Sequence, residues 1–200
     1  MPKRKIGVSS RLIAVAKEEF LQKGFEGAVI KEIAAKADTS PRAIYTRFAN
    51  KEDLFCCVVN PVVEEFYKQF EFDKEDYWNG NAKTVNSAAD YYIRYLEFAY
   101  AHREEFLILL TKSKGTKYAH FTRMLAEADI KHAMAKTTEE LVEFPGNMVV
   151  TELFINQITY AFYDSLFVPF IRGDSLEVAK GYITMMVDFY LNGLSKLVKI

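Results

Sequence analysis

A chain of 200 residues, half of them hydrophobic, can bury the core of one large domain or two small ones, which excludes a disordered chain. No run approaches the roughly 18 apolar residues of a membrane span, and no signal-peptide pattern is present, so we expect a cytoplasmic protein with no membrane partner. The two cysteines, Cys56 and Cys57, are adjacent. Neighbouring side chains on a helix diverge by about 100 degrees, so these two are poorly placed for a disulfide.

The net charge of −1 conceals an uneven distribution of charge along the chain. Residues 1–51 carry 11 Lys and Arg against 5 Asp and Glu, a balance of +6, whereas residues 52–200 carry 15 against 22, a balance of −7. Because contacts to phosphates supply most non-specific affinity for nucleic acids, the basic segment suits a nucleic-acid partner. Chance drift from neutrality over fifty residues is the alternative explanation.

The first fifty residues contain two short helical patterns joined by a tight turn. Residues 9–23 predict a supporting first helix, and residues 30–37 repeat apolar positions at helical spacing. Asp38 tolerates a left-handed backbone in the turn, and Ser40 can cap a third helix that begins with proline. This pattern predicts a helix-turn-helix. The outward side of its last helix suits the major groove and comprises Arg42, Ala43, Thr46 and Arg47.

The rest of the chain also reads as helices, with no stretch of period 2 to indicate a strand. Asn50 and Asp53 open a fourth helix that Pro61 must kink or break, and residues 71–81 are expected to form a loop. Further helices are expected over residues 82–111, 117–139, 147–171 and 174–199. The first of these should be interrupted near His102. The third should follow a turn at 143–146 and a cap at Asn147, and the last should follow a capping pattern at Asp174 and Glu177.

The predicted fold is therefore all-α, with about nine helices. A three-helix helix-turn-helix domain is expected in residues 1–50, followed by a C-terminal helical bundle in residues 51–200. The last helix carries an apolar seam suited to packing against other helices, and the helix before it is apolar on so many sides that it must be buried nearly all round. We expect a second copy of the chain to cover them, giving a homodimer through residues of about 147–197, although a central position in a monomer would also explain them.

The C-terminal bundle is rich in aromatic residues that could line an apolar ligand cavity with a few polar groups. Plain core packing is the alternative for each of them. The candidate ligand-binding residues are Tyr95, Phe98, Phe121, Phe154, Gln157, Tyr160 and Asp164. No metal-ligand spacing, nucleotide-binding glycine motif or catalytic grouping stands out, so we predict no metal, no cofactor and no catalytic residues, and hence no enzyme.

Residues 9–55 resemble the TetR family of bacterial transcriptional regulators. The resemblance lies in Ile30-Lys31-Glu32-Ile33-Ala34, in Thr39-Ser40, and above all in the run Ile44-Tyr45-x-x-Phe48-x-x-Lys51. It implies a repressor that binds a palindromic operator in double-stranded DNA as a homodimer and is released by a small apolar or aromatic ligand. An effector-independent DNA-binding dimer and, more remotely, a helical-bundle enzyme are the alternatives.

The resemblance also assigns individual residues, and it has three departures. The tyrosine and lysine that contact phosphate in the family correspond to Tyr45 and Lys51, and Arg47 stands where the family usually has histidine. Ala28 and Val29 replace a Thr/Ser pair, which removes a hydroxyl cap and a phosphate donor. The other two departures are an aspartate in place of the turn glycine and an arginine in place of a small residue, at Asp38 and Arg42.

Overall fold

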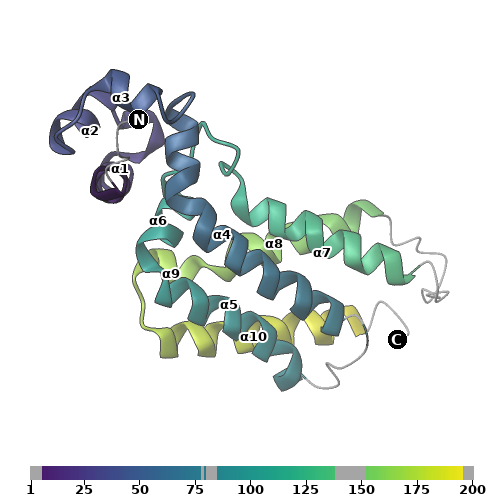
Figure 1. The fold of residues 1–200 in the computed structure, drawn as a ribbon. Helices are drawn as coiled ribbons and strands as arrows, with labels where there is room; N and C mark the ends of the chain where they lie inside the picture. Colours follow the sequence, from purple (N-terminus) through teal and green to yellow (C-terminus); the bar gives the residue numbers. More distant parts are fainter. Residues whose placement is uncertain (1–5, 78, 80–84, 138–151, 196–200) are drawn as a thin grey trace. The chain divides into compact units, whose positions relative to one another are not determined.

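The computed structural model describes residues 6–77, 79, 85–137 and 152–195. The elements in these ranges are helices, ten in number, and this confirms the all-α prediction (Figure 1). The chain forms two compact units. The N-terminal unit comprises the residues up to Glu65 together with His102–His120, and the bundle unit comprises Phe66–Ala101 and the residues from Phe121 onward. The boundary near residue 50 that we predicted between DNA binding and ligand binding stays a prediction.

The N-terminal unit is built from α1 (Ile6–Gly27), α2 (Ile30–Lys36), α3 (Pro41–Tyr45), the first part of α4 (Lys51–Asp76) and α6 (Arg103–Thr111). Its core is a set of three aromatic rings with centroids 5.1 to 6.2 Å apart, surrounded by aliphatic side chains that are at most 1% exposed. The rings belong to Phe20, Phe25 and Phe55, and the aliphatic residues include Leu12, Ala16, Ile33 and Ile44.

The predicted caps and turns of this unit are largely confirmed. Gly24 breaks the helical geometry of α1 with φ 72°, which is why a glycine is needed there. The side chain of Asn50 accepts the N–H of Asp53 at 2.8 Å and so caps α4. Asp53 in turn accepts the N–H of Ala49 at 3.0 Å, one residue earlier than a standard capping box requires. Pro61 lies inside α4 without ending the helix.

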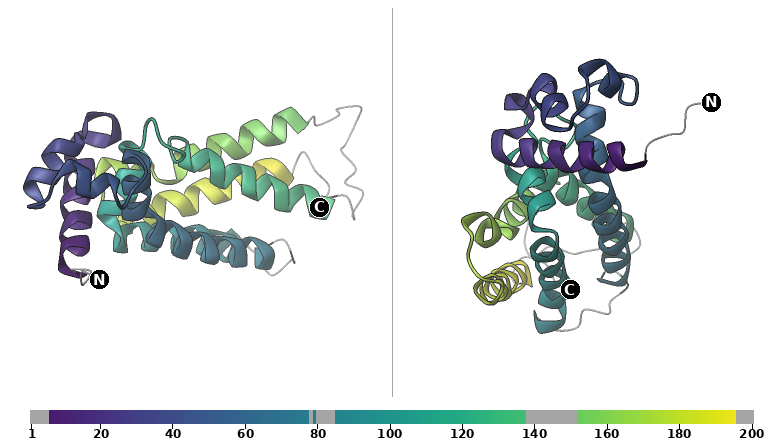
Figure 2. Two further views of the ribbon diagram at one scale, coloured as in Figure 1. Left: turned by 45° about the horizontal axis from the view of Figure 1, so that its top comes forward. Right: turned by 60° about the vertical axis from the view of Figure 1, so that its left-hand side comes forward.

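The bundle unit contains the remainder of α4 with α5 (Val85–Ala101), α7 (Phe121–Thr137), α8 (Glu152–Leu166), α9 (Val168–Arg172) and α10 (Leu176–Ser195). Helix α10 packs along α5, and α7 packs along α8 (Figure 2). Ala179, Ile183 and Val187 are at most 2% exposed, so the apolar seam that the sequence predicts along the last helix faces inward. In the described ranges, no helix has both the length and the apolar character needed to cross a bilayer.

The predicted loop over residues 71–81 is wrong in its first part, because α4 continues to Asp76. Two charged residues of this segment, Asp73 and Lys74, are 1% exposed and bonded to other helices. These interactions offset the cost of burying charged side chains in the core. The loop was predicted because the segment is acidic, and acidic segments are usually exposed to solvent. The predicted interruption near His102 is confirmed, since it separates α5 from α6.

Three further boundaries differ from the predictions. The helix expected over 147–171 divides at Phe167, because Pro169 lacks the N–H that a continuous helix would use there, and the extra break gives ten helices instead of nine. Ser175, not Asp174, caps α10 through the N–H of Val178. The helix expected from residue 117 begins at Phe121, after a hydrogen-bonded turn. The turn at 143–146 and the cap at Asn147 lie outside the described residues.

Candidate nucleic-acid interface and ligand region

Helix α3 is held by one buried residue and exposes Arg42 and Tyr45 to solvent. Ser40 caps it by accepting the N–H of Ala43 at 3.2 Å, and Ile44 is fully buried beneath it. The side chain of Tyr45 is 52% exposed, so the phenol is not part of the core. The exposed residues of this short segment are Arg42, Tyr45, Thr46 and Arg47, while Ala43 is half-buried.

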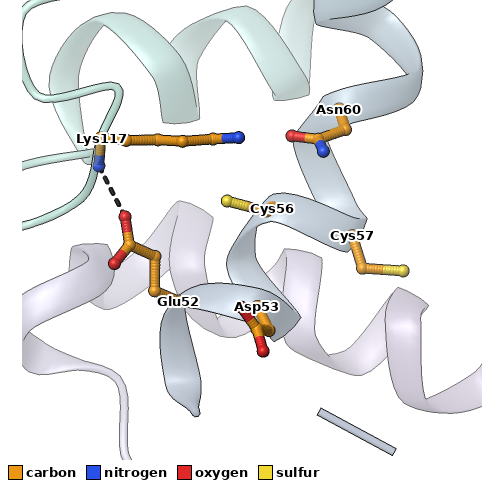
Figure 3. A pocket seen from close by; sticks show the side chains of 6 residues that line it. All are labelled: Glu52, Asp53, Cys56, Cys57, Asn60 and Lys117. Carbon is orange, nitrogen blue, oxygen red and sulfur yellow. Dashed lines mark hydrogen bonds between the residues drawn. The ribbon is translucent and has the colours of Figure 1, made fainter. Parts of the chain in front are cut away.

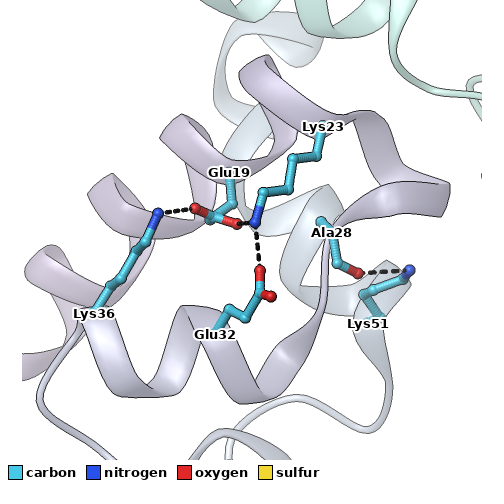
Figure 4. A network of polar contacts seen from close by, with 6 residues as sticks. All are labelled: Glu19, Lys23, Ala28, Glu32, Lys36 and Lys51. Atoms are coloured by element: carbon cyan, nitrogen blue, oxygen red, sulfur yellow. Dashed lines mark hydrogen bonds and ion pairs between the residues drawn. The ribbon is translucent and has the colours of Figure 1, made fainter.

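Helix α2 is fixed against α1 by a buried carboxylate. Glu19 is fully buried and pairs with Lys36 and, at 2.9 Å, with Lys23, which also reaches Glu32 (Figure 4). The hydrogen bond from Lys36 and the neighbouring Lys23 charge hold the pKa of Glu19 below its usual value, despite the opposing effect of burial. The ion pairs therefore fix the angle between α1 and α2 on which the position of α3 depends.

The turn between α2 and α3 explains why an aspartate can replace the expected glycine. Asp38 adopts φ 49°, the left-handed region predicted for it, and its carboxylate pairs with Arg11 at 2.6 Å. Four of the basic side chains in the first 51 residues are thus neutralised within this unit, namely Arg11, Lys17, Lys23 and Lys36. In the described part of the chain, Arg42 and Arg47 have no ion-pair partner, so positive charge remains free on α3 and just after it.

Lys51 has a role that the sequence did not reveal. Its ammonium donates to the carbonyl oxygen of Phe25 at 2.6 Å and to that of Ala28 at 3.1 Å, and lies 4.4 Å from the centroid of the Phe25 ring. These carbonyls belong to the end of α1 and the link that follows it, where a cation is favoured by the helix dipole. Contact between Lys51 and DNA phosphate stays a prediction, while the structure shows the lysine stabilising the junction of α1, α2 and α4.

The loss of the hydroxyl pair at residues 28 and 29 is visible in the structure. Val29 occupies the N-cap position of α2 with φ −115° and ψ 122°, and no side chain caps the helix. The N–H of Glu32 bonds to the Val29 carbonyl at 3.0 Å instead. The N-terminal end of α2 therefore lacks the side-chain oxygen that such a position usually supplies.

Comparison with known proteins supports this interpretation of the N-terminal segment. Residues 12–56 match the bacterial regulatory proteins of the tetR family. This segment of the chain belongs to the TetR family. It contains α2, α3 and the start of α4, with the exposed arginines and Lys51.

Individual relatives extend the likeness beyond the helix-turn-helix. The HTH-type transcriptional repressor NicS of Pseudomonas putida is 29% identical over 109 residues, which cover 49% of this chain and 51% of NicS. The chain thus aligns with about half the length of that relative. Two solved structures share the TetR fold. A TetR-like regulator from Rhodococcus sp. RHA1 is 15% identical, with a TM-score of 0.64 over 96% of this chain and 100% of the other. FadR from Bacillus subtilis, in complex with stearoyl-CoA, is 14% identical, with a TM-score of 0.54 over 90% and 97%.

In the bundle unit, the predicted ligand residues fall into two groups. Tyr95, Phe98 and Phe121 surround Phe66, with ring centroids 5.4 to 6.0 Å from it. The other four lie on the outer side of α8, and Tyr163 is the α8 residue that reaches the ring cluster, 6.2 Å from Phe70. Of these four, Phe154 and Gln157 are exposed. The ring centroid of Tyr160 lies 4.4 Å from the guanidinium carbon of Arg123, and Asp164 accepts a hydrogen bond from Thr122 at 2.8 Å.

Sequence reasoning missed a buried charged group beside the ring cluster. Lys74, 1% exposed, donates to the carboxylate of Asp129 at 2.9 Å and to the hydroxyl of Tyr92 at 3.0 Å. The hydroxyl of Tyr163 donates to the same carboxylate oxygen at 2.8 Å. A signal was present in the sequence, because the helical spacing of the aromatic residues Phe66 and Phe70 continues through positions 73–74 to Tyr77.

A surface pocket in the N-terminal unit contains both cysteines (Figure 3). Cys56 and Cys57 point in different directions, and both are free thiols, as the sequence predicts. Burial raises the pKa of each thiol, which keeps them protonated and weakly nucleophilic. Glu52 accepts the backbone N–H of Lys117 at 2.7 Å across the pocket. Within the described ranges, no three His, Cys, Asp or Glu side chains are grouped so as to hold a metal ion.

Proposed function

We propose that this protein is a TetR-type transcriptional repressor that binds a palindromic operator in double-stranded DNA as a homodimer. The observation that carries the proposal is the exposed surface of α3 and the residues just after its end. Among the described residues, Arg42 and Arg47 have no ion-pair partner there, while Ile44 anchors the helix from below. Arginines of this kind bind phosphates and the edges of guanine, and Tyr45 and Thr46 add hydroxyl groups to the same surface.

Dimerisation is supported by an exposed apolar stripe on α10. Val178, Met185 and Phe189 are 56%, 75% and 73% exposed, and their spacing of seven and four residues places them on one side of the helix. Leu153 on α8 is 66% exposed. Large apolar side chains exposed at helical spacing favour burial against a second copy of the same helices. If Phe189→Asp sediments with the same mass as the natural protein at micromolar concentration, this interface is wrong.

Release from DNA by a small ligand is the second part of the proposal. The bundle contains the aromatic cluster around Phe66 and a buried polar group beside it, which is the composition of a small-molecule site. FadR, which shares this fold, is described in complex with stearoyl-CoA, so the fold can accommodate a ligand. The ligand would stabilise an arrangement of the dimer in which the two α3 helices no longer match successive turns of DNA.

The DNA surface is tested by substitution with a matched control. Arg47→Ala should weaken operator binding and lower the slope of log affinity against log salt by about one, because one phosphate contact is lost. Lys114→Ala removes a cation of the same unit that is 84% exposed and pairs with Glu26 at 3.3 Å, and should leave both quantities unchanged. Equal behaviour of the two variants would refute the assignment of the DNA surface.

A further inference from the structure

The bundle unit contains a charge pair that neither DNA binding nor dimerisation requires. The ammonium of Lys74 lies 4.4 Å from the ring centroid of Tyr92, and the rings of Phe70, Tyr77 and Tyr163 lie 5.4 to 5.6 Å from it. Its partner Asp129 is also buried, and the residues that meet here come from α4, α5, α7 and α8. A buried ion pair rarely stabilises a fold more than well-packed apolar side chains would, so stability alone does not account for it.

Next to this pair lies a hydroxyl group that has no hydrogen-bond partner. Tyr95 is fully buried, its ring contacts those of Phe66, Phe70 and Tyr92 at 5.4 to 5.8 Å, and within the described residues nothing accepts its hydroxyl hydrogen. Native proteins seldom leave a buried hydroxyl unsatisfied, because the lost hydrogen bond to water is not replaced. An absent molecule with a hydrogen-bond acceptor would resolve this cost.

The charges around Tyr95 restrict what that molecule can be. Lys74 is already paired with Asp129, and Asp73 is paired with Arg94 at 2.7 Å, so each buried charge has its counter-charge. An added carboxylate would bring an unpaired anion close to two aspartates, and an added cation would face Lys74 and Arg94. Burying an unpaired charge is costly in either case, which leaves an uncharged ligand.

We propose that Tyr95, beside the Lys74–Asp129 pair, forms the polar end of a site for a small uncharged aromatic molecule that carries a carbonyl oxygen. The Tyr95 hydroxyl donates to that oxygen, and the rings of Phe66, Phe98 and Phe121 pack against the aromatic part. Phe98 is the partly exposed member of this ring set and offers the route of entry. The inference rests on the proposed function, since it specifies the effector of the same bundle.

Four probes of similar size test the charge and acceptor requirements on the full chain by titration calorimetry. Methyl benzoate supplies a neutral acceptor, benzoate an anion, benzylamine a cation, and toluene no acceptor. Methyl benzoate should bind, and benzoate and benzylamine should bind at least about tenfold more weakly. Tyr95→Phe should weaken methyl benzoate about fivefold, the contribution of one hydrogen bond, and leave toluene unchanged.

The matched control is Tyr100→Phe, on the same helix, whose hydroxyl donates to the Asp174 carbonyl at 2.7 Å. Without any probe, Tyr95→Phe should melt at or above the temperature of the natural protein, whereas Tyr100→Phe should melt lower. The inference is overturned if no probe binds, if benzoate binds as well as methyl benzoate, or if Tyr95→Phe loses as much stability as Tyr100→Phe. Operator binding without a probe is measured on the same samples, so a failure there counts against the proposed function and not against this site.

Discussion

Replacing Lys51 by methionine separates a role in folding from a role in DNA binding. Methionine keeps the length and apolar character of the side chain but removes the ammonium, which donates to Phe25 at 2.6 Å and Ala28 at 3.1 Å. If the lysine acts mainly by holding the end of α1, the variant must lose stability even when DNA is absent. Arg47, exposed and without an ion pair among the described residues, provides the contrasting case.

The expected size of the effect follows from these contacts. Hydrogen bonds from a charged donor contribute about 1.5–3 kcal/mol each when buried, and solvent screening reduces this at the half-buried Lys51. The ammonium also lies over the Phe25 ring at 4.4 Å, which adds about 0.5–1 kcal/mol. We therefore expect Lys51→Met to lower the free energy of unfolding by about 2–3 kcal/mol. Arg47→Ala should change it by less than about 0.5 kcal/mol.

Urea unfolding followed by circular dichroism measures both values, and operator binding is then measured at a temperature where each variant is folded. Lys51→Met should lose stability together with affinity, while Arg47→Ala should lose affinity alone. If Lys51→Met unfolds at the same urea concentration as the natural protein, the carbonyl contacts do not stabilise the domain. The lysine would then be free to act on phosphate, as the family resemblance implies.

Three other substitutions test further parts of the structure. Val29→Thr supplies the missing cap of α2 and should raise the free energy of unfolding by about 1 kcal/mol. Urea unfolding measures this change, and an unchanged midpoint would show that the threonine does not cap the helix. Lys74→Met leaves Asp129 buried without a counter-charge and should lower the free energy of unfolding by about 3–5 kcal/mol. The double variant Lys74→Met/Asp129→Leu should recover most of this loss, and a double variant no more stable than the single one would contradict the explanation. Folding lowers the pKa of Glu19, so ionised Glu19 stabilises the domain when the pH is above the pKa that this residue has in the unfolded chain. This stabilisation is lost as the pH falls through the pKa of Glu19 in the folded protein. Glu19→Gln should therefore lose less stability than the natural protein between about pH 5 and 3, as judged by thermal melts across that range.

The helix-turn-helix could be predicted because its determinants are local. A cap at Ser40 and a left-handed residue at Asp38 follow from backbone preferences that act over a few residues, and both are seen in the structure. The pairing of Asp38 with Arg11 could not be predicted, since it joins residues far apart in the sequence. The same holds for Lys51, whose carbonyl partners lie more than twenty residues earlier.

The bundle was less predictable because long-range contacts decide its details. Acidic and aromatic residues at 71–77 are typical of a loop, yet Asp73 and Lys74 become helical once Arg94 and Asp129 neutralise them. The candidate ligand residues on α8 follow from its aromatic content and from polar groups within an apolar helix, and neither property tells one side of a helix from another. A break at Phe167, by contrast, could have been found from Pro169 alone.

The most direct test of the central claim is selection of bound sequences from random double-stranded DNA by the purified chain. A repressor that binds as a two-fold dimer should enrich one inverted repeat, with half-sites whose centres are separated by whole turns of DNA. Arg47→Ala should recover the same repeat more weakly. Enrichment of no common sequence, or of a single half-site without its inverted copy, would contradict the account.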